Sequence, residues 1–150
     1  QQNTLIYASV LHDIGKVGIP DSILNDAKDL DILQVDTIQR HSEIGASIVE
    51  KLDIPDPSKV AELVRMHHER EDGKGYPYGL SAEQIPVGAQ IIAVVDVFDA
   101  LTSHRSYRPA IGQAKAIEIL QAEVGGQFNK DVVDAFKISY EHKGENIFMV

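Results

Sequence analysis

The stretch "VRMHHEREDGKGYPYGL", residues 64–80, runs from a helical pattern into a glycine-rich segment and contains two adjacent histidines, His67 and His68. Neighbouring residues of an α-helix point about 100° apart, so these imidazoles cannot share one narrow face. Two metal ions about 3.5–4 Å apart require ligands that diverge in this way. The doublet therefore indicates that each imidazole faces a different ion, the alternative being that one of them is idle.

The rest of the chain is dominated by helical patterns. Apolar residues recur at intervals of three and four through most of the sequence, and no alternating strand pattern of convincing length occurs. We therefore predict an all-α, single-domain helical bundle over residues 1–142, with a tail at 143–150. A long irregular segment is expected at 71–86. The predicted helices span residues 3–13, 31–52, 57–68, 86–101, 113–124 and 129–142.

Composition restricts the function classes. The 150 residues include no cysteine, which excludes disulfides and thiol chemistry and fits a reducing cytoplasm. The longest apolar run, Ile91–Val95, is too short for a membrane span. A net charge of −9 argues against binding to a DNA or RNA polymer. We expect a cytoplasmic protein that binds an anionic ligand only through locally concentrated positive charge.

Six polar residues interrupt the apolar helix faces and form the predicted metal-ligand set. A single histidine or aspartate on such a face is usually a hydrogen-bonded core residue or a helix cap, but six on four helices indicate a shared site. Imidazole and carboxylate without thiolate suit iron, manganese or zinc, and a carboxylate from Asp13 or Asp96 would link the ions. The predicted ligands are His12, Asp13, His41, His67, His68 and Asp96.

Basic residues follow the acidic ligands. Lys16 comes three residues after Asp13, and Arg105 and Arg108 follow the helix that carries Asp96. Guanidinium groups bind phosphate in a bidentate manner, although arginines at a helix end also pair with the helix dipole. Asp99, one turn after Asp96, is expected to orient Lys16 or bound water. The pattern predicts metal-assisted hydrolysis at a phosphoryl group, with Asp13, Lys16 and Asp99 as catalytic residues.

The glycine-rich segment is predicted to form a wall of the same pocket. It lacks the spacing of a Walker loop or a dinucleotide fingerprint, and a plain series of turns is the alternative. Its place directly after the histidine doublet favours contact with substrate through Gly75, Tyr76 and Pro77. Tyr76 would pack against a base, and Pro77 would fix its backbone.

Four segments together resemble the HD-GYP family of the HD phosphohydrolase superfamily. These are "LHDIGKVGIPDSIL", "RHSEIGASI", "HHEREDGKGYP" and "DVFDALTSHRSYRPA", in the family's order and spacing over residues 11–136. The resemblance implies an all-helical HD-type domain that hydrolyses cyclic di-GMP to pGpG, in some members to GMP, while some relatives act on cyclic GMP-AMP. It implies two or three divalent ions, mostly iron or manganese, with zinc, nickel or magnesium as alternatives.

The same resemblance places the residues selected above in the metal site and the substrate site, with Asp13 as the bridge between ions. It also implies bacterial signalling, a fused receiver or sensor domain, a diguanylate cyclase partner, and a homodimer as an option. Family members carry further helices and another histidine ligand before the HD pair, whereas only eleven residues precede His12 here. We therefore expect an N-terminally incomplete domain and metal site.

Two rival functions remain open at this point. A domain with impaired catalysis could act as a cyclic dinucleotide sensor or as a protein-interaction module. An HD hydrolase of another nucleotide, such as (p)ppGpp or a dNTP, is the second rival. The Gly-Tyr-Pro loop and the segment "DALTSHRSYR" argue against the second.

Overall fold

The computed structural model describes residues 2–24, 31–104 and 109–146. Within these ranges the chain is helical and forms no strand, only isolated bridges between Asp72 and Ser81 and between Val124 and Phe128. The α-helices are α1 (Gln2–Leu11), α2 (Asp21–Leu24), α3 (Ile32–Gln39), α4 (His41–Val49), α5 (Pro57–Met66), α6 (Val87–Thr102), α7 (Gln113–Ala122) and α8 (Lys130–Asn146), with short 3-10 helices η1 (Ile14–Gly18) and η2 (Ala82–Gln84). The predicted all-α fold is confirmed. No described helix has both the length and the apolar character needed to cross a bilayer.

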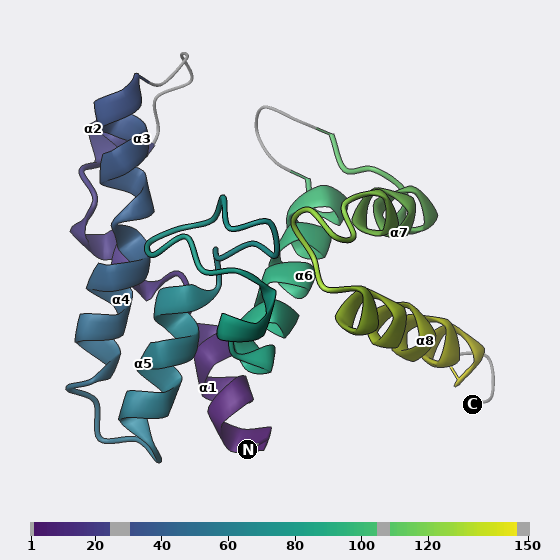
Figure 1. Cartoon of the computed structure of the whole chain (residues 1–150), viewed down its shortest axis with the longest axis horizontal. Helices are drawn as coiled ribbons and strands as arrows, with labels where there is room; N and C mark the ends of the chain where they lie inside the picture. Colours follow the sequence, from purple (N-terminus) through teal and green to yellow (C-terminus); the bar gives the residue numbers. More distant parts are fainter. Residues whose placement is uncertain (1, 25–30, 105–108, 147–150) are drawn as a thin grey trace.

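Helix α6 joins two groups of helices (Figure 1). On one side, α1, α4 and α5 pack together with the first turns of α6 around a core that includes Ala8, Val49 and Val64. On the other side, α7 and α8 pack on the later turns of α6 around Val94 and Leu120. Both clusters need apolar residues from α6, which explains why its sequence is apolar on most sides. Helix α6 is therefore central to the packing of the described helices.

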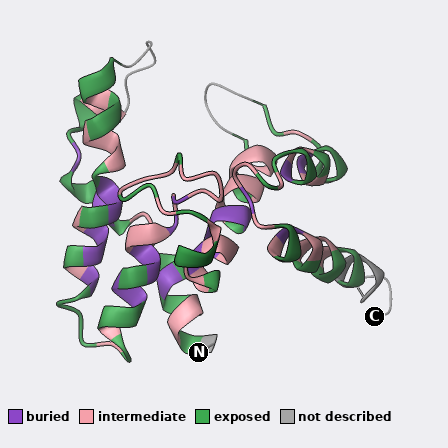
Figure 2. Cartoon of the chain, viewed as in Figure 1, coloured by how far each residue is buried: buried purple, intermediate pink, exposed green. Residues whose placement is uncertain are grey.

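The predicted helix over residues 31–52 is two helices. The chain breaks the helix at Arg40, between α3 and α4. Figure 2 shows that buried residues follow α4 and α5, while α3 contains no buried residue. Val35 and Leu52, apolar residues near the two ends of the helix predicted over 31–52, are both exposed. The prediction was wrong at these two ends because α3 lies beyond the packed core and α4 ends at Val49.

Several helix boundaries also differ from the predicted ones. Helix α1 ends at Leu11 and α5 ends at Met66, so the HD pair and the histidine doublet follow helices instead of continuing them. Helix α8 extends to Asn146, past the predicted end near residue 142. The two 3-10 helices and α2 were not predicted, since segments of three to five residues show no periodicity. The irregular segment at 71–86 is present apart from η2.

Candidate metal centre

Four imidazoles gather where three helices end or begin. His12 follows α1, His41 opens α4, and His67 and His68 follow α5. The His67 ring centroid lies 5.2 Å from that of His12, 5.4 Å from that of His41 and 3.9 Å from that of His68. The His41 and His68 centroids are 5.0 Å apart. Residues separated by up to 56 positions in sequence therefore form one cluster.

Three of these rings are fixed by the same local contact. Nδ1 lies 2.7 Å from the Ser9 carbonyl oxygen in His12, 2.7 Å from the Ile38 oxygen in His41 and 2.6 Å from the Val64 oxygen in His67. A carbonyl oxygen can only accept, so Nδ1 carries the proton, and in the neutral ring Nε2 keeps its lone pair. Metal-binding histidines are commonly oriented by this kind of contact.

The Nε2 atoms that remain available indicate a bound cation. Nε2 of His12, His41 and His67 is buried without a hydrogen-bond partner among the described residues. A buried polar atom left unpaired is costly, so three such atoms in one cluster require a shared ligand. Ligand nitrogens of His41, His67 and His68 lie within 4.8 Å of one another, close enough for one ion. The residues present therefore fit a metal centre.

Two carboxylates complete the cluster. Asp13 directs Oδ2 toward His12 Nε2 and Oδ1 toward His41 Nε2, at 3.6 Å in each case. Asp96 Oδ1, on α6, lies 3.6 Å from His12 Nε2. The two oxygens of Asp13 thus face imidazoles from different helices, the arrangement expected of a bridging carboxylate. The structure brings all six predicted ligand residues together.

A family model described as the HD domain matches residues 1–132. The chain belongs to the HD-domain family. Its sequence is 38% identical over 130 residues to a cyclic di-GMP phosphodiesterase of Thermotoga maritima, covering 87% of this chain and 35% of the relative. It is 39% identical over 127 residues to a 3'3'-cGAMP-specific phosphodiesterase of Vibrio cholerae, covering 85% of this chain and 24% of the relative. The resemblance inferred from the four motifs is confirmed.

A solved structure supports the HD-domain fold. The crystal structure of a cyclic GMP-AMP-specific phosphodiesterase from V. cholerae superposes with a TM-score of 0.68 at 20% identity, covering 93% of this chain and 38% of the other. The curated relatives are longer than this HD domain, which spans about a third of the first and a quarter of the second.

Lys16 controls the charge state of Asp13 in the HD domain. Its Nζ donates to Asp13 Oδ2 at 2.6 Å, from the last turn of η1. Burial alone would raise the pKa of Asp13, but the hydrogen bond and charge of Lys16, together with the charges of His12 and His41, outweigh burial and lower it. The pKa of Asp96 is lowered mainly by its contact with His12. Both carboxylates are therefore ionised at neutral pH and can offset the charge of a cation.

Burial keeps most of the cluster neutral. It lowers the pKa of His67 to about 4 and that of His68 to about 2, and it also lowers the pKa of His41. His12 differs, because the Asp96 carboxylate raises its pKa. Metal ligation needs a neutral imidazole. At neutral pH, His41, His67 and His68 already have the protonation state that ligation requires.

We expect the metal-free domain to lose stability between pH 7.5 and pH 5. The folded-state pKa of His67 lies below its ordinary 6.5, so the unfolded chain binds more protons as the pH falls through this window. This residue alone should lower the free energy of unfolding by roughly 2 kcal/mol at pH 5. The lowered pKa values of Asp13 and Asp96 affect stability only at more acidic pH. The raised pKa of His12 changes stability in the opposite direction, toward greater stability as the pH falls. Urea unfolding of the chelated protein measures the slope, which should become less steep in His67→Gln but remain, because the pKa values of His41 and His68 are lowered as well.

The Gly-Tyr-Pro segment lies on the cluster. The Tyr76 ring stacks on His68 with centroids 4.7 Å apart and lies 6.4 Å from His41. Gly75 fits where no larger residue could, since a Cβ there would lie 2.5 Å from the Glu69 Cα. The Tyr76–Pro77 peptide bond is cis. The segment forms a wall of the site, and one face of Tyr76 is occupied by His68; the proposed contact of Tyr76 with a base stays a prediction.

The other predicted residues are placed differently. Asp99 is exposed and accepts a hydrogen bond from Ser103 Oγ at 3.2 Å, while Lys16 pairs with Asp13. The expected contact between Asp99 and Lys16 is thus absent from the described contacts. Arg105 and Arg108 lie outside the described residues, and their role in phosphate binding stays a prediction.

Sequence reasoning missed Glu69, which directly follows the doublet. Only 4% of it is exposed, and both of its carboxylate oxygens accept hydrogen bonds from the segment that contains Tyr76. A single glutamate after two histidines carries no periodic signal, and its burial becomes visible only when the segment is folded back over it.

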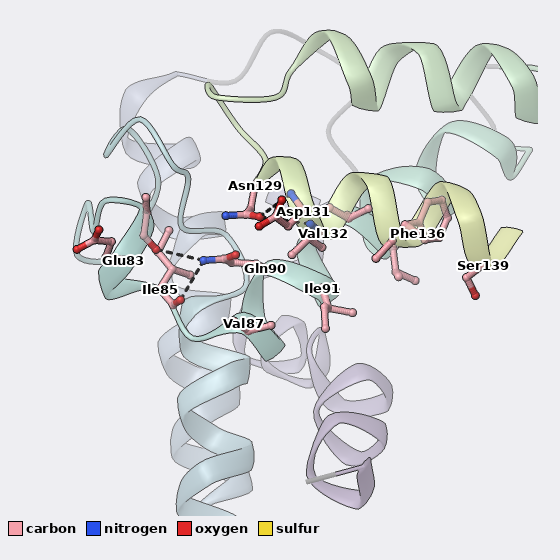
Figure 3. Close-up of a pocket in the computed structure, with 14 residues that line it drawn as sticks. Glu83, Ile85, Val87, Gln90, Ile91, Asn129, Asp131, Val132, Phe136 and Ser139 are labelled. Carbon is pink, nitrogen blue, oxygen red and sulfur yellow. Dashed lines mark hydrogen bonds between the residues drawn. The ribbon is translucent and has the colours of Figure 1, made fainter.

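One groove in the described part of the chain is separate from the metal centre. A groove of about 660 Å³ lies between α6 and α8 (Figure 3). Its floor is apolar, with Ile91, Val132 and Phe136, and none of the six predicted ligands lines it. Gln90 at its edge donates to the carbonyls of Ala82 and Ile85, which ties the end of the Gly-Tyr-Pro segment to α6. The histidine cluster remains the candidate for chemistry.

Proposed function

We propose that this HD domain is the catalytic unit of a phosphodiesterase that hydrolyses cyclic di-GMP to pGpG. The supporting observation is the convergence of four imidazoles and two carboxylates, with three buried Nε2 atoms that have no hydrogen-bond partner among the described residues. The activity named for the Thermotoga maritima relative is consistent with this cluster. The cluster also has the donor composition expected of a hydrolytic metal site.

The proposed ligands are His12, Asp13, His41, His67, His68 and Asp96. Divalent cations bound in such a site supply a water molecule of lowered pKa and neutralise charge on a phosphoryl group. Nitrogen and oxygen donors without thiolate favour iron or manganese, and the diverging His67 and His68 favour two or three ions over one. Asp13 serves as the proposed bridge.

The proposed roles of the remaining residues concern the substrate. Lys16 lies beside Asp13 with its ammonium group half exposed, so it can contact both the bridge and a phosphate oxygen. Gly75, Tyr76 and Pro77 form the wall against which the dinucleotide would lie. Arg105, Arg108 and Asp99 remain proposed contributors. We also propose a diguanylate cyclase partner, a fused regulatory domain and a homodimer.

Cyclic GMP-AMP is the second candidate substrate. The chain is 39% identical to a relative named for that dinucleotide and 38% identical to one named for cyclic di-GMP. The chain is thus about equally similar to relatives named for two substrates that differ in one base. Both share the phosphodiester chemistry, so the same cluster serves either.

The proposal is tested with purified protein prepared without oxygen. After chelation, addition of Mn²⁺ or Fe²⁺ should restore hydrolysis of cyclic di-GMP at least about 100-fold over the metal-free protein, with pGpG followed by chromatography. Cyclic GMP-AMP serves as the parallel substrate. Binding without turnover would favour the sensor function. Turnover of cyclic GMP-AMP alone would show that cyclic GMP-AMP, and not cyclic di-GMP, is the substrate.

A further inference from the structure

His68 is held differently from the other three imidazoles. Those three each donate Nδ1–H to a backbone carbonyl, whereas the imidazole of His68 has no hydrogen bond among the described residues. Its ring instead contacts other rings. The centroid of the His68 ring lies 3.9 Å from that of His67, 5.0 Å from that of His41 and 4.7 Å from that of Tyr76, and the planes of His68 and Tyr76 make an angle of 29°. The orientation of His68 therefore depends on where Tyr76 is held.

Tyr76 is held by its backbone. Its N–H donates to the His68 carbonyl oxygen at 3.2 Å. The preceding Gly75 lies so close to residues 68–70 that an added Cβ would be 2.5 Å from the Arg70 nitrogen. The segment thus folds back directly over the chain that carries the doublet. To keep the segment this close to the chain below it, the residues that follow Tyr76 must also be held by hydrogen bonds.

Glu69 supplies that anchor. Its Oε1 accepts from the Tyr78 N–H at 2.7 Å, and its Oε2 accepts from the Leu80 N–H at 2.8 Å. A buried carboxylate is costly unless it is satisfied, and here each oxygen has a short charge-assisted hydrogen bond. The entrance of the segment is tied separately, by Arg70 to both oxygens of Asp72. The carboxylate next to His68 thus fixes the far end of the loop that covers His68.

We propose that Glu69 is a positioning residue of the metal centre: by holding the Tyr78 and Leu80 backbone, it keeps the Tyr76 ring on His68 and sets the direction of that imidazole. The inference rests on the proposed function only in taking His68 as a metal ligand. It requires no particular nucleotide substrate.

A double-mutant cycle tests this. Glu69→Gln keeps the side-chain size but turns one acceptor into an NH2 group facing an N–H, and Tyr76→Leu removes the stacked ring. Each variant should lower the affinity for Mn²⁺, measured by calorimetry, about 10-fold. The double variant should also lose about 10-fold, not 100-fold, because both changes act through one contact. The imidazole NMR signals of His68 in the metal-free protein should move in both variants, whereas those of His12, whose ring contacts neither His68 nor Tyr76 among the described residues, should stay.

Glu71→Gln is the matched control. This glutamate lies two residues further on and accepts a hydrogen bond from Asn129 Nδ2 at 2.8 Å, away from the rings. The Mn²⁺ affinity of Glu71→Gln should stay within about twofold of that of the unsubstituted protein, because Glu71 orients none of the proposed ligands.

Three outcomes would overturn the proposal. Glu69→Gln could fail to fold, it could displace all histidine signals alike, or the double variant could lose about 100-fold in affinity. A wild-type chain that binds Mn²⁺ and shows the expected cycle, yet hydrolyses no cyclic dinucleotide, would contradict the proposed function and leave this inference intact. If no Mn²⁺ binds, the NMR signals still decide whether Glu69 controls the contact between Tyr76 and His68.

Discussion

Asp13→Asn is expected to lower the rate of cyclic di-GMP hydrolysis about 1,000-fold, the upper range for removing one preorganised charge-stabilising group. The carboxylate lies 3.6 Å from the Nε2 atoms of both His12 and His41 and 2.6 Å from Lys16 Nζ. Asparagine has the same shape but is neutral, so it neither balances a divalent cation nor pairs with Lys16. Turnover by the metal-loaded protein and Mn²⁺ affinity by calorimetry should both fall.

Asp134→Asn is the control for Asp13→Asn. Asp134 pairs with Lys130 at 2.6 Å, the same distance as the pair of Asp13 and Lys16, but it lies on the surface of α8. Solvent screens this exposed pair, so the control should keep its turnover within about twofold. If Asp13→Asn retains a tenth or more of the activity, Asp13 is not the bridge.

Gly15→Ala is expected to destabilise the domain by about 3 kcal/mol, at the upper end for overpacking. A Cβ at Gly15 would lie 1.9 Å from the His41 carbonyl oxygen and 2.5 Å from the Gly45 nitrogen, which are backbone atoms. Only separation of η1 from α4 can relieve this clash. The expected fall in melting temperature is about 6–12 °C, measured by circular dichroism.

The same substitution should weaken metal binding, because η1 follows Asp13 and α4 begins with His41. Gly112→Ala provides the comparison: Gly112 caps α7 with an ordinary backbone conformation, and a Cβ there would meet nothing within 4 Å. Its free energy of unfolding should change by less than about 1 kcal/mol. A melting temperature for Gly15→Ala equal to that of Gly112→Ala would contradict the packing of η1 on α4.

Sequence patterns predicted the helices with continuous apolar faces. The central α6 has apolar residues on most sides, and this composition alone indicates a helix packed between others. The same reasoning failed around Arg40, since a repeat of apolar residues cannot show that Val35 and Leu52 stay exposed in the folded chain. Periodicity measures what a helix can bury, and the tertiary fold determines what it does bury.

The sequence by itself determined the all-α fold and the residue types of the metal centre. Histidine and aspartate on apolar faces are costly without a shared partner, and that cost is readable from the sequence. Only the folded structure determined that His12, His41 and His67 follow helix ends, where a carbonyl three residues back accepts the Nδ1–H of each and leaves Nε2 free. It also determined the role of Glu69, because a carboxylate acquires partners eleven residues away only when the chain folds back over it.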